Sequence, residues 1–111
     1  MLKRYRIPTI LVYVPFLWVG GLAIFPFVFC SKPKPSARLI NHERIHLRQQ
    51  LELFIVPFYV WYIGEYLIRL IQYKNADKAY RNICFEREAY AKDQNLDYLK
   101  SRRLWSFWKY L

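Results

Sequence analysis

The stretch from Ser36 to Phe54, SARLINHERIHLRQQLELF, carries the strongest structural signal in the chain. Ser36 is a favourable N-cap, and the following residues predict a helix that begins at about Ala37 and continues to Pro57, which breaks or kinks it. On a helical wheel, at about 100° per residue, the apolar side chains form one sector and both histidines of HERIH lie at its edge. Glu43 falls within that sector. The helix is therefore predicted to turn three ionisable groups toward the protein interior.

The chain contains only two histidines, His42 and His46, and they are four residues apart on this predicted helix. That spacing places both imidazoles on one face, about 6 Å apart along the axis, so that two neutral nitrogens can bind one Zn²⁺. Glu43, between them, can reach a water molecule on such a metal. Isolated ionisable groups are costly to bury, and a metal would be their partner. The alternative is a pair of core histidines satisfied by hydrogen bonds, with Glu43 paired to an arginine.

A third zinc ligand is needed, because a catalytic zinc keeps three protein ligands and one open position. With no further histidine, this ligand must be a carboxylate or a cysteine. Glu52 lies on the wrong face of the same helix, and Glu65 is expected to pair with Arg69 four residues later. The best candidates are Glu86 and Glu88, in the segment FEREAYAKD. Helical periodicity alone does not choose between them.

The two segments together, HERIH and EREAYA some forty residues later, resemble the gluzincin metallopeptidases. The second motif of that group reads Glu-x-x-Ala, in which the Glu binds zinc and the small Ala lets two helices approach. By this resemblance His42, His46 and Glu86 are the metal ligands, and Ala89 is the small contact. Glu43 is then the general base that takes a proton from the zinc-bound water during hydrolysis of a peptide bond.

The match leaves two points open at the second motif. Glu88 stays the second choice for the third ligand, because it fits a shifted Glu-x-x-Ala that ends at Ala91. Tyr90 stands where the group often has Asp or Asn, so the usual acceptor for a zinc-bound histidine has to come from elsewhere. Asp93 and Asn82 are the candidates for that role.

The resemblance covers residues 37–95, which form the expected metallopeptidase core within one domain over residues 1–111. A chain of this length leaves little room for a second domain. We expect a mainly α fold of the α+β class, a minimal zincin-like domain. It comprises the HERIH helix, an apolar second helix, a third helix carrying Glu86 and a short β element before the HERIH helix. In zincins such a strand commonly holds the substrate backbone by strand addition, and LAIFPFVF (22–29) is placed to do so.

Residues 7–30 form an apolar segment without a charge, long enough for one membrane span. Three prolines and the pair Gly20-Gly21 interrupt it, which is awkward for a single regular helix. A membrane-inserted segment and a strand-plus-helix piece packed on the core are the two alternatives. Within the segment, LAIFPFVF is rich in β-forming residues and predicts a short strand, with Pro26 placing it at a sheet edge.

The second half of the chain predicts further helices. Residues 58–73 form a helix that is apolar almost all round, and such a helix is buried in a core or in lipid. YKNAD (73–77) contains turn signals, and a third helical region follows over about 85–100. The tail 101–111 alternates basic and aromatic residues, as at a lipid headgroup boundary. The alternative for the tail is a final helix that packs its two tryptophans on the core.

The net charge indicates which class of molecule the protein binds, and the cysteine content indicates whether disulfides hold the fold. The chain has 18 Lys+Arg against 8 Asp+Glu, a formal net charge of +10, which favours an anionic partner. The positive charges are spread along the chain without a recognised nucleic-acid motif, which argues against nucleic acid. Membrane association is expected, with a cytoplasmic protein as the alternative. Cys30 and Cys84 are too few for a disulfide scaffold and are expected to be free and buried.

These features together predict a zinc-dependent metallopeptidase that acts on a peptide or protein substrate at or near a membrane. The reaction needs an oxyanion donor besides zinc, and Tyr80, Arg81 and Tyr90 are the candidates. The alternative is a non-catalytic, membrane-associated module in which zinc holds the helices of a small core together.

Overall fold

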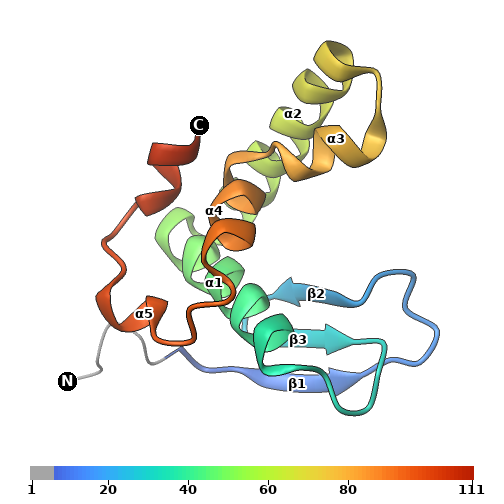
Figure 1. The fold of residues 1–111 in the computed structure, drawn as a ribbon, viewed down its shortest axis with the longest axis vertical. Helices are drawn as coiled ribbons and strands as arrows, with labels where there is room; N and C mark the ends of the chain where they lie inside the picture. Colours follow the sequence, from blue (N-terminus) through green and yellow to red (C-terminus); the bar gives the residue numbers. More distant parts are fainter. Residues whose placement is uncertain (1–6) are drawn as a thin grey trace.

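The computed structural model describes residues 7–111, in which a small sheet precedes five α-helices and a short 3₁₀ helix, η1 (Figure 1). The elements in chain order are β1 (Ile10–Tyr13), β2 (Gly21–Ile24), β3 (Phe27–Cys30), α1 (Ala37–Leu53), α2 (Val56–Tyr73), α3 (Ala76–Arg81), α4 (Cys84–Lys92), α5 (Tyr98–Ser101) and η1 (Ser106–Tyr110). The fold is mixed, with helices predominating, and this confirms the expected α+β class.

The HERIH helix, α1, lies at the centre of the structure, in contact with the sheet and with α4 (Figure 1). It begins as predicted, because the Ser36 hydroxyl accepts a hydrogen bond from the Leu39 amide at 3.1 Å. It ends at Leu53, however, and not at Pro57, because Phe54 adopts a left-handed conformation with φ 58°. Pro57 lies in the first turn of α2, where its missing N–H costs nothing. The two helices meet at 112°.

The sheet has the strand order β1-β3-β2, with β1 parallel and β2 antiparallel to the central β3. The segment 22–29 therefore forms a hairpin and not the single strand that was predicted. Pro26 lies in the turn between β2 and β3, where no ladder hydrogen bond requires its missing N–H. The prediction that Pro26 marks a sheet edge was wrong. The helix expected within residues 7–30 is also absent from this described segment, because strands and turns occupy it.

Helix α2 forms over the predicted stretch, and of the two alternatives for it, burial in a core and burial in lipid, the first does not hold for most of its residues. Phe58 and Glu65 are the residues of α2 that are buried. Its other face is exposed along a stripe of aliphatic residues, each between 52% and 77% exposed: Val56, Val60, Ile63, Leu67 and Ile71. Among residues 7–111, α1 and α2 satisfy the length and hydropathy expected of a membrane span only when taken together across their bend, and neither these nor the other helices do so singly.

The region 73–100 contains more helices than expected. The Asn75 side chain caps a short helix, α3, which begins within the predicted turn 73–77 and extends into a stretch for which no helix was predicted. The expected third helix is divided into α4 and α5, because the side-chain amide of Asn41 on α1 donates to the carbonyls of Asp93 and Asn95 at 2.9 and 3.0 Å. These contacts satisfy the carbonyl of the C-cap residue of α4 and a carbonyl of the turn that follows it, from outside that helix.

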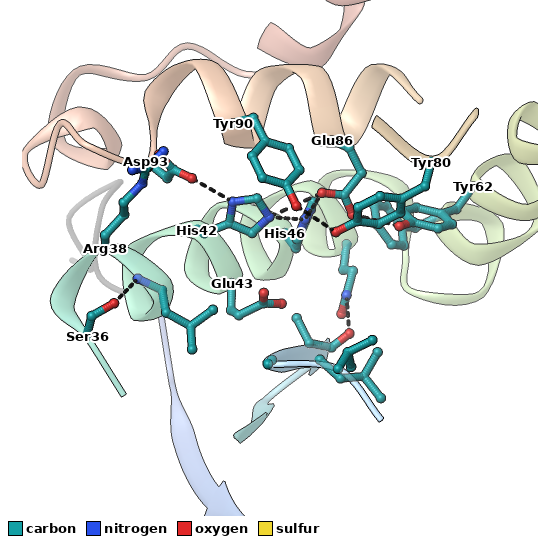
Figure 2. Close-up of a pocket in the computed structure, with 18 of the residues that line it drawn as sticks. Ser36, Arg38, His42, Glu43, His46, Tyr62, Tyr80, Glu86, Tyr90 and Asp93 are labelled. Atoms are coloured by element: carbon teal, nitrogen blue, oxygen red, sulfur yellow. Dashed lines mark hydrogen bonds and ion pairs between the residues drawn. The ribbon is translucent and has the colours of Figure 1, made fainter. Parts of the chain in front are cut away.

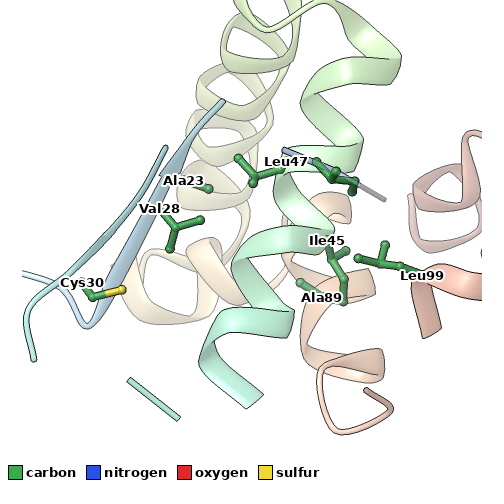
Figure 3. Close-up of a cluster of buried hydrophobic side chains, with 8 residues drawn as sticks. Ala23, Val28, Cys30, Ile45, Leu47, Ala89 and Leu99 are labelled. Carbon is green, nitrogen blue, oxygen red and sulfur yellow. The ribbon is translucent and has the colours of Figure 1, made fainter. Parts of the chain in front are cut away.

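The C-terminal segment packs on the body through Phe107, which is fully buried, while Trp105 and Trp108 are 47% and 57% exposed. Of the two alternatives for the tail, the final helix does form, as η1, but it buries Phe107 and not the two tryptophans. The main hydrophobic core joins the sheet to α1, α4 and α5 (Figure 3). Cys30 and Cys84 are free and buried, as predicted.

Candidate metal site

Three side chains from α1 and α4 converge on one point (Figure 2). His42 and His46 project from successive turns of α1, and Glu86 faces them from the first turn of α4. The Nε2 atoms of the two imidazoles are 3.2 Å apart, and Glu86 Oε1 lies 3.2 Å from the first and 3.1 Å from the second. All three residues are buried. This group could hold a metal ion.

The dimensions of this triangle suit a small tetrahedral ion. Bonds of about 2.0–2.1 Å at tetrahedral angles place the ligand atoms about 3.3 Å apart, and the observed separations are 3.1–3.2 Å. Two imidazole nitrogens and one carboxylate oxygen are also ligands that zinc accepts. The residues present therefore fit a zinc ion.

The far side of each imidazole is held by a hydrogen bond. Asp93 Oδ2 lies 3.0 Å from His42 Nδ1, and its other oxygen accepts from Arg38 at 2.8 Å. Gln49 Oε1 lies 2.8 Å from His46 Nδ1. Because both partners accept at Nδ1, each Nε2 is left to face the centre of the triangle. Asp93 thus takes the role expected of it, while Asn82 accepts from Arg87 instead.

The contact between His46 and Glu86 shifts the pKa values of these two groups in opposite directions. Burial lowers the pKa of His46, but the charge and hydrogen bond of Glu86 outweigh burial and raise that pKa to about 9. Burial acts to raise the pKa of Glu86, and the two histidines overcome it and hold that pKa far below its usual range. A proton on His46 therefore compensates the buried Glu86 carboxylate, in the place where a metal cation would do so.

Glu43 lies on the same turn of α1 and is buried at the wall facing β2. A Cβ at Gly21 would come within 3.1 Å of Glu43 Oε2, so the glycine allows the strand to approach the carboxylate closely. Burial raises the pKa of Glu43 above its usual range, although the charges of His46 and His42 oppose the shift. This carboxylate is adjacent to the three converging atoms without belonging to the triangle.

Glu88 points away from the histidines. It forms an ion pair with Arg102, with contacts from Nε and Nη2, and also accepts a hydrogen bond from the Tyr98 hydroxyl at 2.6 Å. Gln49 donates to it at 2.9 Å, so Glu88 touches the site only through the partner of His46. Glu52 pairs with the same arginine, and Glu65 pairs with Arg69 as predicted.

The site opens into a cavity of about 700 Å³ between α1, α2, α4 and the edge strand β2. Tyr62 donates to Glu86 Oε2 at 2.6 Å, and the hydroxyls of Tyr80 and Tyr90 lie 3.1 Å apart at the same wall. Burial, together with the adjacent Glu86, raises the pKa of both Tyr62 and Tyr80 well above the usual range, so both remain donors. Arg81 is not among the residues that line this cavity and pairs with Asp77.

Searches against protein-family models, curated proteins and solved structures found no match to this chain. The site is therefore described from its own residues. Sequence reasoning missed Gln49 and Tyr62. Gln49 lies three residues after His46 on the interior face of α1. A polar residue at that spacing on a buried face could have indicated a hydrogen-bond partner for His46.

Proposed function

We propose that this protein is a zinc-dependent metallopeptidase, with His42, His46 and Glu86 as the zinc ligands and Glu43 as the general base. The observation that carries the proposal is the triangle of two imidazole nitrogens and one carboxylate oxygen, spaced at 3.1–3.2 Å. Its position in an accessible cavity beside a second, non-ligating carboxylate supports a catalytic rather than a purely structural metal. The α+β arrangement, with a strand before the HERIH helix, supports a zincin-like domain.

When bound, zinc would supply an acidified water and polarise the peptide carbonyl. Glu43 would take the proton from the attacking water and pass it to the leaving amine. Its burial supports this role, because a carboxyl with a raised pKa both accepts and returns a proton more readily near neutral pH. Tyr80 and Tyr90 are the candidates for the oxyanion donor, and their position in the cavity supports them.

The edge strand β2 is the proposed binding element for the substrate backbone. Its residues 21–23 line the cavity beside Glu43, and the opposite edge of β2 pairs with β3. An extended peptide added along the cavity edge of β2 would pass in front of the metal site. The Ala23 carbonyl is already engaged by Gln50 and Tyr59, which restricts such pairing to the part of β2 nearer Gly21.

The test is Glu43→Gln, assayed with labelled casein after loading with zinc. We expect the variant to keep about one zinc per chain and to lose about 10²–10⁴-fold of the hydrolysis rate, the range typical of a lost general base. Mass spectrometry measures the metal, and release of labelled peptides measures the activity. The matched control is Asp97→Asn, which also replaces a carboxylate by its amide. The Asp97 side chain is 76% exposed and does not line the cavity.

Each outcome of this test is informative. If the wild type binds zinc but does not hydrolyse casein, the result would favour the non-catalytic module, in which the metal holds α1 to α4. Unchanged turnover in Glu43→Gln would remove that residue from the mechanism. A wild type that binds no zinc after loading would refute the metal site itself.

A further inference from the structure

The outer face of α2 is a feature of the structure that the proposed chemistry leaves unused. With Val56 at zero and about 100° per residue, the exposed residues Val60, Ile63, Leu67 and Ile71 all fall within about 60° of it. These five residues, which we call the α2 stripe, run the length of an 18-residue helix without a charged residue among them. An uninterrupted aliphatic stripe of this kind marks a contact surface.

The opposite face of α2 faces the protein body. Phe58, Tyr62 and Glu65 lie between about 180° and 240° on the same wheel. Phe58 and Tyr62 pack into the aromatic cluster below the helix, and Glu65 accepts from the Cys84 amide at 3.0 Å. The α2 stripe thus points directly away from this core, and the exposure of its residues shows that no described part of residues 7–111 covers it.

The charge on the molecular surface indicates what covers the stripe. Six of the eight acidic side chains are buried, five as whole residues and Glu52 with a side chain that is 3% exposed. The other two, Asp77 and Asp97, are 76% exposed and already paired with Arg81 and Lys100. The surface is therefore strongly positive. Two copies of such a surface repel each other, whereas an anionic surface attracts it.

The C-terminal segment places an aromatic residue beside α2. The rings of Trp108 and Trp61 have centroids 6.0 Å apart, and Trp61 lies at about 140° on the wheel, next to Ile68 at about 120°. Trp108 is 57% exposed, and the basic Lys109 follows it. Trp108 thus lies on the flank of α2, nearer the inner face than the stripe, and an exposed tryptophan followed by a lysine is a composition also found at the headgroup level of a bilayer.

We propose that the α2 stripe docks on an anionic lipid bilayer, with α2 lying along the membrane surface. This inference does not depend on zinc or on peptide hydrolysis. Because Phe58 and Tyr62 on the inner face of α2 also line the cavity, docking would hold the metal site about one helix diameter, ~10 Å, from the lipid.

The experiment is flotation of the full chain with phosphatidylcholine vesicles, with and without phosphatidylserine. We expect binding to be at least about tenfold stronger with phosphatidylserine and to weaken as salt is raised. The test variant is Ile63→Gln with Leu67→Gln, at the centre of the stripe, and it should lose at least about tenfold in binding. Both positions are already exposed, so circular dichroism should show an unchanged fold.

The matched control is Ile10→Gln with Leu96→Gln, which changes two apolar residues of comparable exposure, 49% and 59%, outside α2. This variant should bind as the wild type does. Equal binding by the stripe variant, or no binding by the wild type to either vesicle, would overturn the proposal. So would a lipid-free dimer in analytical ultracentrifugation that the stripe variant abolishes, because the occupant of the stripe would then be a second copy of the chain.

Discussion

Glu86 and Glu88 lie two residues apart on α4, and both are buried, yet they contact opposite kinds of partner. Glu86 faces two imidazoles, which are ligands that a metal ion accepts in their neutral form. Glu88 faces the guanidinium of Arg102, which does not lose its proton in a protein. Residues two apart on a helix are about 200° apart around its axis, so a helix with one face to α1 necessarily separates them.

The difference shows how one short helix combines a reactive and a structural carboxylate. The Glu86 side has exchangeable partners and opens into the cavity, as a metal site requires. The Glu88 side is a closed ion pair that ties the C-terminal segment to α4. Gln49 joins the two sides, because it accepts from His46 and donates to Glu88. The predictions below test this division of roles.

The largest effect is expected for Glu86→Ala on zinc binding. Loss of a direct ligand should weaken zinc affinity on the order of 10³-fold, since outer partners of ligands typically account for 10–100-fold. Competition with a chromophoric chelator measures the affinity. Glu88→Ala should change it far less, and the opposite ranking would show that the motif alignment is off by two residues.

Glu88→Ala is expected to act on folding instead. Removing one partner of a buried ion pair costs about 3–5 kcal/mol, and we expect about 3 kcal/mol because Arg102 keeps Glu52. Urea unfolding of the metal-free protein, followed by circular dichroism, measures the change in free energy of unfolding. A variant as stable as the wild type would contradict the structural role of this side of α4.

The substitution Gln49→Leu removes the side chain that bonds both to His46 and to Glu88. His46 then loses the acceptor for its Nδ1 hydrogen, and zinc affinity should fall by about 10–100-fold. The neighbouring Gln50→Leu is the matched control, because Gln50 is equally buried but bonds to Ala23 and Phe25 of the hairpin. Equal zinc affinities in the two folded variants would show that Gln49 does not orient the histidine.

The smallest effect per step, about tenfold per pH unit, is expected from a change of pH. The His46 pKa is raised from 6.5 to about 9, so its contribution to the stability of the metal-free protein is fully present below pH 6.5 and is lost as pH rises through 9. Zinc must displace the same proton, so apparent zinc affinity should rise by about tenfold per pH unit up to about pH 9. Chelator competition at several pH values measures this slope, and a flat profile would contradict protonation of His46.

Expectations based on local spacing held where the structure tests them. The Ser36 cap, the placement of His42 and His46 on one face and the Glu65–Arg69 pair all depend on residues within about four positions of each other. The same reasoning failed where distant contacts decide the outcome. Asn41 ends α4 from another helix, and Phe107, rather than the tryptophans, fills the core.

The sequence by itself determined that one helix presents two histidines and a glutamate on its interior face, because the helical repeat is a local property. Only the tertiary structure decided that Glu86 and not Glu88 meets those histidines, and that Gln49 and Asp93 hold their far sides. The rotation of α4 about its axis is set by packing of Phe85 and Ala89 against residues far away in the chain. The exposure of the α2 stripe has the same origin, because an apolar helix is covered only where the remainder of the fold reaches it.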